Sequence, residues 1–208
     1  MKFLKHAVAI LFVLFSTQAM ADLVEGKDYK LISNPQATSS GNKIEVLEFF
    51  FYGCSHCFHL HPDLTSWEKK MPKDVVLTFV PTIFNSNWEP MAYTYYALEV
   101  LGKNNDLHND LYDAWNVKNT DLSDESKITP FVVQRGVDGK KFGEAYHSFG
   151  VQSKIMRSKQ LTQTYNIRGT PTLIVDGKYA ITGLQPADSI RVLSALIDKA
   201  RKERSGNR

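Results

Sequence analysis

Only two cysteines occur among the 208 residues, and the chain has little net charge and no long apolar run beyond its N-terminus. The charge of +3 falls to about +1 without Lys2 and Lys5, which is too balanced to predict a nucleic-acid partner. No later segment has the roughly 20 apolar residues that a membrane-spanning helix needs. Internal repeats and low-complexity tracts are also absent, so the sequence predicts an ordinary globular chain.

The first 21 residues have the three-part pattern of a secretory signal peptide. Lys2 and Lys5 form a basic start, residues 7–15 are apolar, and residues 19–21 read Ala-Met-Ala, a small-x-small cleavage site. The alternative is an uncleaved N-terminal anchor, although the apolar stretch is short for one. We expect residues 1–21 to be removed, which leaves an exported protein of about 187 residues.

The two cysteines, Cys54 and Cys57, are separated by only Ser55 and His56. Exported proteins reside where disulfides form and persist. A disulfide that closes such a short loop adds little stability, because the entropic benefit grows with loop length. Chemistry therefore explains this pair better than structural cross-linking does.

The hydrophobic pattern predicts strands and helices in a mixed order. Residues 44–52 are almost continuously apolar, as in a buried central strand, and residues 55–70 have helical spacing despite Pro62. Asp176 and Gly177 supply the turn of a hairpin. The remaining predictions are a strand at 75–81, helices between 85 and 160, strands at 172–175 and 178–182, and a last helix after Pro186 whose basic tail is expected to fray.

Within the helical block, Thr129 is predicted to cap a short helix, with Pro130 as its first residue. Phe142 and Phe149 are predicted to share the apolar face of a further helix. The aromatic residues of this block are interpreted as core, because their helical spacing suits burial and no cofactor motif accompanies them.

A Cys-x-x-Cys motif is compatible with haem attachment, half of a zinc site, or a redox pair. Haem attachment requires histidine directly after the second cysteine, where this chain has Phe58. Zinc requires further ligands, and His59 and His61 would lie on different faces of a helix. A redox pair requires a helix N-terminus after a buried strand, and that context is predicted here.

This placement predicts the chemistry of Cys54. Free backbone N–H groups and the helix dipole favour its thiolate, and a protonated His56 would strengthen that effect. A stabilised thiolate makes the disulfide a stronger oxidant. Cys57, nearly one turn further along, is expected to be more buried and less reactive. His56 has a plain alternative as a solvated loop residue.

Two further positions are unusual for their context. Glu48 interrupts an apolar strand; if buried beneath the cysteines, its pKa should rise and it could exchange protons with Cys57. The alternative is a glutamate that faces solvent. Thr170 and Pro171 begin the strand at 172–175, where proline removes a hydrogen-bond donor and commonly marks a turn or strand start.

Together these segments resemble the thioredoxin superfamily and, within it, the DsbA family of bacterial periplasmic oxidants. The matching pieces are VLEFFFYGCSHC, the proline five residues after Cys57, and GTPTLIVDGKY. The resemblance implies an α/β thioredoxin fold with a central mixed sheet, interrupted by an inserted all-helical domain. Its expected parts are 22–84 and 159–208 for the thioredoxin fold and 85–158 for the insertion.

The resemblance also implies roles for individual residues. Cys54 corresponds to the exposed nucleophile, Cys57 to its buried partner, His56 to the residue that strengthens the acidity, and Glu48 to the buried acid. The Thr170–Pro171 pair corresponds to the cis-proline site that binds extended substrate chains. Two departures stand out: Ser55 replaces the proline of the best-known members, and residues 77–80 offer no lysine as a partner for Glu48.

The expected activity is disulfide donation in the periplasm to reduced, unfolded exported proteins, without cofactor or metal. A membrane quinone-linked oxidase resembling DsbB would reoxidise the pair, and the protein would be a monomer. One alternative is a disulfide reductase or isomerase, although residues 22–42 leave no room for the dimerisation module of periplasmic isomerases. Another is a non-enzymatic protein that binds a metal or a peptide.

Overall fold

The computed structural model describes residues 23–206, so the predicted signal peptide at residues 1–21 lies outside the described residues. Five strands form one sheet in the order β1-β5-β4-β2-β3, with β2 and β3 parallel and the other pairs antiparallel. The strands are β1 (Lys30–Leu31), β2 (Ile44–Phe50), β3 (Val75–Pro81), β4 (Thr172–Val175) and β5 (Tyr179–Thr182). This is the predicted mixed sheet, with β1 as a strand that the sequence did not indicate.

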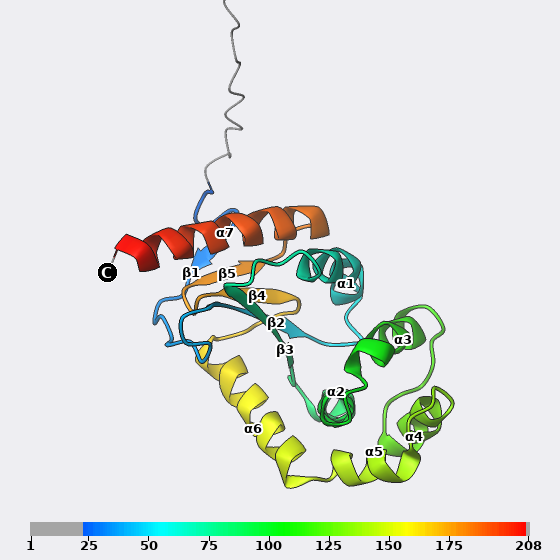
Figure 1. Ribbon diagram of the computed structural model, residues 1–208. Helices are drawn as coiled ribbons and strands as arrows, with labels where there is room; N and C mark the ends of the chain where they lie inside the picture. The colour runs from blue at the N-terminus through cyan, green and yellow to red at the C-terminus, as the bar shows by residue number, and fades with distance from the viewer. Residues whose placement is uncertain (1–22, 207–208) are drawn as a thin grey trace, which may run out of the picture.

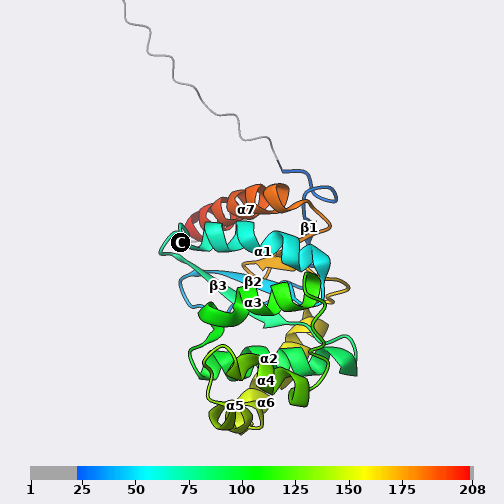
Figure 2. The ribbon, with the colours of Figure 1, turned by 90° about the vertical axis from the view of Figure 1, so that its right-hand side faces the viewer.

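Helices α1 and α7 cover one face of the sheet, and the remaining helices lie on the other side and beyond its β3 edge (Figures 1 and 2). The α-helices are α1 (Ser55–Glu68), α2 (Glu89–Val100), α3 (Asn104–Asn116), α4 (Glu125–Val133), α5 (Gly139–Tyr146), α6 (Phe149–Thr164) and α7 (Pro186–Gly206). Along the chain, α2–α6 lie between β3 and β4. These two strands flank β2 in the sheet.

Alternation along β2 sorts its side chains between two cores. Val46 packs in a cluster with residues of α1 and α7, whereas Leu47 and Phe49 pack with Tyr165 and Ile167 at the end of α6. Because side chains alternate with a period of two, the residue at position 48 faces the side covered by α1.

A third cluster fills the helical part and reaches the end of β2. Phe50, Tyr52 and Cys57 pack there with buried residues of α2 and α3, such as Tyr95 and Leu111. The aromatic side chains of the helical part are thus mostly core, as predicted. Cys54 and Cys57 lie where this cluster meets the sheet.

Two helix predictions in this part were wrong. Helix α4 begins earlier than Thr129, because Asp124 caps it by accepting a hydrogen bond from the Lys127 N–H at 3.2 Å; Pro130 consequently lies inside the helix. Phe149 begins α6 after the cap residue Ser148, and its side chain is 84% exposed rather than core.

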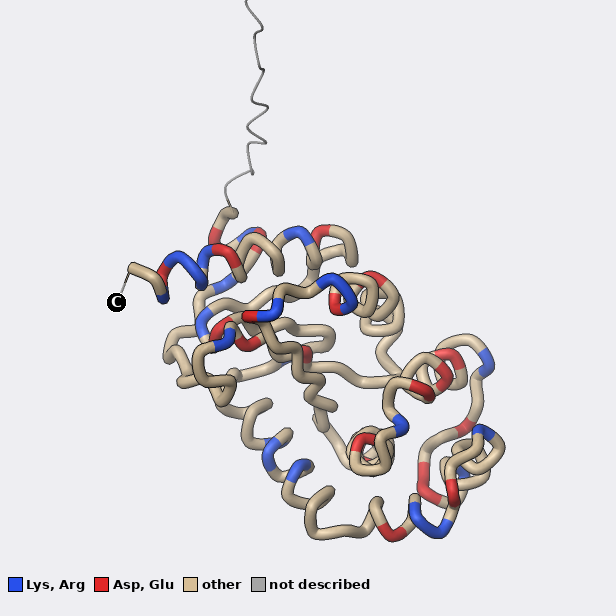
Figure 3. Tube along the Cα trace, in the orientation of Figure 1, with Lys and Arg blue, Asp and Glu red and all other residues tan. Residues whose placement is uncertain are grey.

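The C-terminal prediction was also wrong, because α7 continues to Gly206 instead of fraying. Arg201 pairs with Asp74 at 2.8 Å, and Arg204 pairs with Asp176 in the β4–β5 turn. Acidic and basic residues are interspersed along this helix (Figure 3). Smaller differences concern boundaries: β2, α1 and β5 are each one or two residues shorter than predicted.

The β4–β5 turn matches its prediction. Asp176 and Gly177 both have positive φ, 53° and 66°, as the two central residues of a type I′ hairpin turn require. A Cβ at Gly177 would lie 2.1 Å from the Gln36 carbonyl oxygen, so only glycine fits against the N-terminal segment.

Candidate active site

Cys54 occupies the N-cap position of α1, directly after the loop that leaves β2. Its extended backbone (φ −90°, ψ 113°) turns the chain into the helix, and no side chain caps the first N–H groups of that helix. These N–H groups are therefore free to interact with the Cys54 sulfur. Both cysteines are free thiols in the structure; Cys54 is half-buried, and Cys57 is fully buried at 0% exposure.

The environment lowers the pKa of Cys54 from its usual 9.0 to about 5. The largest cause is a hydrogen bond from the Cys57 thiol; smaller ones come from Thr170 and from the backbone N–H groups of Cys57 and His56, against the opposing effect of partial burial. Burial raises the pKa of Cys57 far above its usual range. The pair thus combines one thiolate at neutral pH with one thiol that stays protonated.

The loop before Cys54 is held by α3. The Asn116 side-chain N–H donates to the Tyr52 carbonyl oxygen at 2.8 Å, and the Tyr52 hydroxyl lies 2.6 Å from Nδ1 of His108. At Gly53 a Cβ would lie 2.7 Å from the Trp115 indole nitrogen, so glycine permits this close packing. Sequence reasoning missed these α3 residues, because nothing in their spacing signals contact with a loop some 60 residues away.

Glu48 lies on the α1 side of the sheet and is completely buried, so the solvent-facing alternative was wrong. Neither carboxylate oxygen has a hydrogen-bond partner among the described residues. Burial, the largest cause, raises the pKa of Glu48 from 4.5 to about 8. Its charge in turn contributes to the raised pKa of Cys57, after burial and the hydrogen bond with Cys54.

The Thr170–Pro171 peptide bond is cis, as the family resemblance implied. The Cys54 thiol lies 3.2 Å from the Thr170 carbonyl oxygen, to which it can donate while protonated. A groove of about 200 Å³ runs from His56 and His59 past Pro171 to Gln185. The structure thus brings Cys54, Cys57, Glu48 and Thr170–Pro171 together, with the exposed side chain of His56 at the rim.

The structure also tests the residues between 23 and 206 for a metal site and for a membrane-spanning helix. No group of three or more His, Cys, Asp or Glu side chains in this range could hold a metal ion, and His59 and His61 do not converge on the cysteines. Between residues 23 and 206, no helix combines the length and apolar character required to cross a bilayer.

Comparison with known proteins gives one consistent result. The family described as DSBA-like thioredoxin domain matches residues 59–195. The thiol:disulfide interchange protein DsbA of Pseudomonas aeruginosa is 33% identical over 192 residues, covering 90% of this chain and 91% of the relative. DsbA of Bordetella parapertussis is 36% identical, covering 85% and 86%.

Solved structures agree with the sequence comparison. The crystal structure of Pseudomonas aeruginosa DsbA matches with a TM-score of 0.83 at 32% identity, covering 86% of this chain and 95% of that chain. The oxidoreductase DsbA from Xylella fastidiosa matches with a TM-score of 0.81 at 29% identity, covering 86% and 98%.

Proposed function

Because the chain belongs to the family of DSBA-like thioredoxin domains, we propose that it donates its Cys54–Cys57 disulfide to reduced, unfolded proteins. It is a thiol–disulfide oxidoreductase that acts on substrate proteins by thiol–disulfide exchange. The donor direction, the periplasmic location and the residue roles below are our proposal.

The observation that carries the donor direction is the pKa of Cys54, which lies near 5. A thiol with such a low pKa is a good leaving group and is stable as an anion at neutral pH. Reduction of the disulfide releases that anion, so reduction is favourable and the disulfide is a strong oxidant.

The first step forms a mixed disulfide between Cys54 and the substrate. A substrate thiolate attacks the Cys54 sulfur, the Cys54–Cys57 bond breaks, and its electron pair leaves on Cys57. That buried thiolate takes up a proton, because burial holds the pKa of Cys57 high. Protonated Glu48, with a pKa of about 8, is the proposed donor, and it regains its proton from solvent.

The second step releases the product. A second substrate thiolate attacks the substrate sulfur of the mixed disulfide, and Cys54 leaves as a thiolate stabilised by the helix N-terminus. The substrate has then lost two electrons, and the enzyme has gained them. Backbone groups at Thr170 and cis-Pro171 are proposed to hold the substrate segment beside Cys54.

The proposed setting is the periplasm, reached through the signal peptide at residues 1–21. A DsbB-like, quinone-linked membrane oxidase is the proposed electron acceptor that restores the disulfide. We further propose that the protein acts as a monomer, with the groove beside Pro171 open to substrates.

The decisive experiment mixes the oxidised protein with a reduced, unfolded polypeptide that contains cysteines. We expect substrate disulfides to form stoichiometrically while Cys54 and Cys57 become free thiols, and Cys54→Ser to abolish the reaction. Donation is refuted if the substrate stays reduced while Cys54 reacts normally with a thiol reagent.

Equilibration with glutathione provides an independent check. A strong donor should remain reduced until the buffer contains a large excess of oxidised glutathione. If the 54–57 disulfide instead forms as readily as a structural disulfide, the protein would be a reductase rather than a donor.

A further inference from the structure

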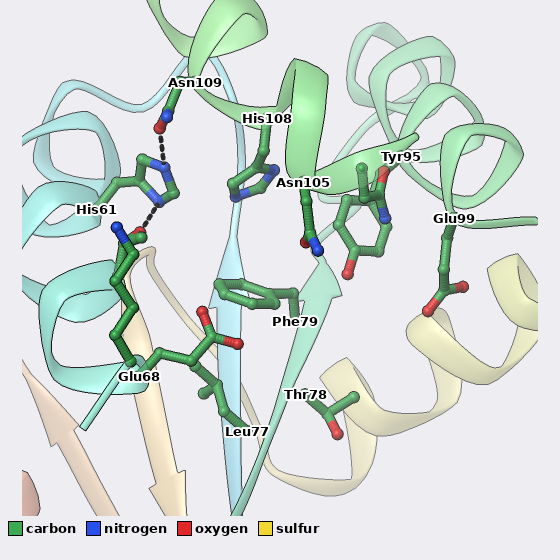
Figure 4. A pocket seen from close by; sticks show the side chains of 13 residues that line it. His61, Glu68, Leu77, Thr78, Phe79, Tyr95, Glu99, Asn105, His108 and Asn109 are labelled. Carbon is green, nitrogen blue, oxygen red and sulfur yellow. Dashed lines mark hydrogen bonds between the residues drawn. The ribbon is translucent and has the colours of Figure 1, made fainter. Parts of the chain in front are cut away.

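A second cavity, of about 600 Å³, lies apart from Cys54 and Pro171, between α1, β3, α2 and α3. His61 and Glu68 line one side, Tyr95 and Glu99 line the other, and β3 runs between them (Figure 4). Its volume lies in the range of sites that bind ligands.

The strand in this cavity, β3, is one of the two edge strands of the sheet, and among residues 23–206 it pairs with β2 alone. Two hydrogen bonds fix which of its backbone groups face β2. Ile44 N–H donates to the Asp74 carbonyl oxygen, and Thr82 N–H donates to the Phe50 carbonyl oxygen, both at 2.8 Å. Backbone groups alternate in direction along a strand, so the even-numbered residues from 74 to 82 face β2.

The odd-numbered residues consequently direct their backbone groups to the open edge. Leu77 and Phe79 do so, and both line the cavity. An open edge presents a row of unpaired N–H and C=O groups that can pair with another extended chain. Here the row lies beside a recess lined by residues of α1, α2 and α3.

The charge of the cavity favours a basic occupant. Glu99 is neutralised by Lys154 at 2.7 Å, whereas the partly buried Glu68 has no ion pair within the described range. Burial raises the pKa of Glu68, and the charge of Lys69, which also lines the cavity, offsets only part of that effect. A cation placed at Glu68 would remove this cost.

We propose that this cavity is a second polypeptide-binding site, in which an extended segment pairs with the β3 edge and places a lysine or arginine at Glu68. Strand addition of this kind obtains affinity from backbone hydrogen bonds and selectivity from side-chain contacts. The site is independent of disulfide exchange, and it would hold a substrate chain at a second point while Cys54 reacts.

The direct test titrates the oxidised, isotopically labelled protein with a cysteine-free peptide of alternating valine and lysine, followed by NMR. We expect saturable shifts of the Leu77 and Phe79 amide signals. Shifts confined to the surroundings of Thr170 and His56, or no saturable shifts, would overturn the second site. Because the peptide cannot react with Cys54, failure here leaves disulfide donation untouched.

The charge preference is tested with a peptide in which glutamine replaces lysine. We expect it to bind roughly threefold to fivefold more weakly, the range of a partly exposed ion pair. Glu68→Gln should abolish that difference, whereas the matched variant Glu99→Gln should preserve it. If Glu68→Gln leaves the lysine preference intact, the assigned position of the cation is wrong.

The edge pairing is tested by Leu77→Pro, which removes an outward N–H, against Leu77→Val, which keeps it. Proline is tolerated on an edge strand where its missing N–H faces away from the sheet. We expect about tenfold weaker peptide binding for Leu77→Pro alone. Equal binding by both folded variants would exclude edge pairing.

Hydrogen exchange in the unmodified protein answers the same question if Leu77→Pro fails to fold. Bound peptide should slow exchange of the Leu77 and Phe79 N–H groups. Unchanged exchange at saturating peptide would contradict the proposal.

Discussion

Cys54 and His56 lie within one turn at the start of α1, but they contribute to the site through different groups. The His56 backbone N–H helps to stabilise the Cys54 thiolate, while its side chain is exposed. The sequence-based role of the imidazole therefore remains a prediction, separate from the effect of the backbone.

Thiolate absorbance measured against pH tests that role. The wild-type protein should show a Cys54 pKa near 5, and His56→Ala should raise it, because a protonated imidazole near the sulfur favours the anion. The exposed His59 provides a control, since His59→Ala should have less effect. An unchanged pKa in His56→Ala would assign the whole effect to Cys57, Thr170 and the backbone N–H groups.

Glu48 makes stability depend on pH with a definite sign. Its pKa rises from 4.5 to about 8 on folding, so the folded state holds a proton that the unfolded state releases. Stability from this group is complete below pH 4.5 and is lost as pH rises to about 8, by up to about 5 kcal/mol.

Glu48→Gln should remove that loss, because the amide mimics the protonated acid and does not ionise. Denaturant unfolding at pH 5 and pH 8 should show a smaller decline for the variant than for wild type. Parallel declines in the two proteins would show that Glu48 ionises normally.

At the scale of elements, α3 connects the helical part to the catalytic loop. Asn116 donates to the carbonyl oxygens of Tyr52 and Tyr112, and Trp115 packs against Gly53. The loop between β2 and α1 therefore depends on a helix that follows it by about 50 residues.

Asn116→Ala should lower the free energy of unfolding by about 1–3 kcal/mol, because it leaves the partly buried Tyr52 carbonyl without its donor. Chemical denaturation measures this directly. Asn105→Ala on the exposed side of the same helix is the control, and it should change stability far less. Equal effects from both variants would mean that the loop contact contributes nothing specific.

The predictions of helices, strands and turns succeeded where the sequence offered one local signal and no alternative signal nearby. Asp176–Gly177 requires positive φ at both positions, so the hairpin was predictable. Thr129–Pro130 is equally local, but Asp124 caps the helix five residues earlier, and the sequence does not rank the two caps. The two-residue strand β1 has no hydrophobic signal of its own and forms only because β5 is beside it.

At the scale of the whole molecule, the two redox forms should differ in stability. The reduced form contains the stabilised Cys54 thiolate, which the oxidised form lacks. Because the pKa of Cys54 is depressed from 9.0 to about 5, this stability is fully present above pH 9 and is lost as pH falls through 5.

Reduced protein should accordingly unfold at higher denaturant concentration than oxidised protein at pH 7, and the difference should shrink towards pH 4. Cys54→Ser, which has no thiolate at this position, should lose most of that pH dependence. An oxidised form that is the more stable at pH 7 would contradict the proposed donor role.

The sequence by itself determined the cysteine pair, its position between a buried strand and a helix, and the order of the strands and helices that follow β1. These features follow from local spacing and from the short loop between Cys54 and Cys57. The family resemblance predicted a cis peptide bond before Pro171, and the structure confirmed it. The separate domain boundaries at 85 and 158 remain a prediction.

Only the tertiary structure decided the surroundings of these residues. Complete burial of Glu48, contact between α3 and the catalytic loop, and the recess beside β3 all join segments distant in sequence. Burial and desolvation depend on every element packed around a group, so no local pattern encodes them. The same physics sets the pKa values of Glu48 and Cys57, and with them the proposed direction of the reaction.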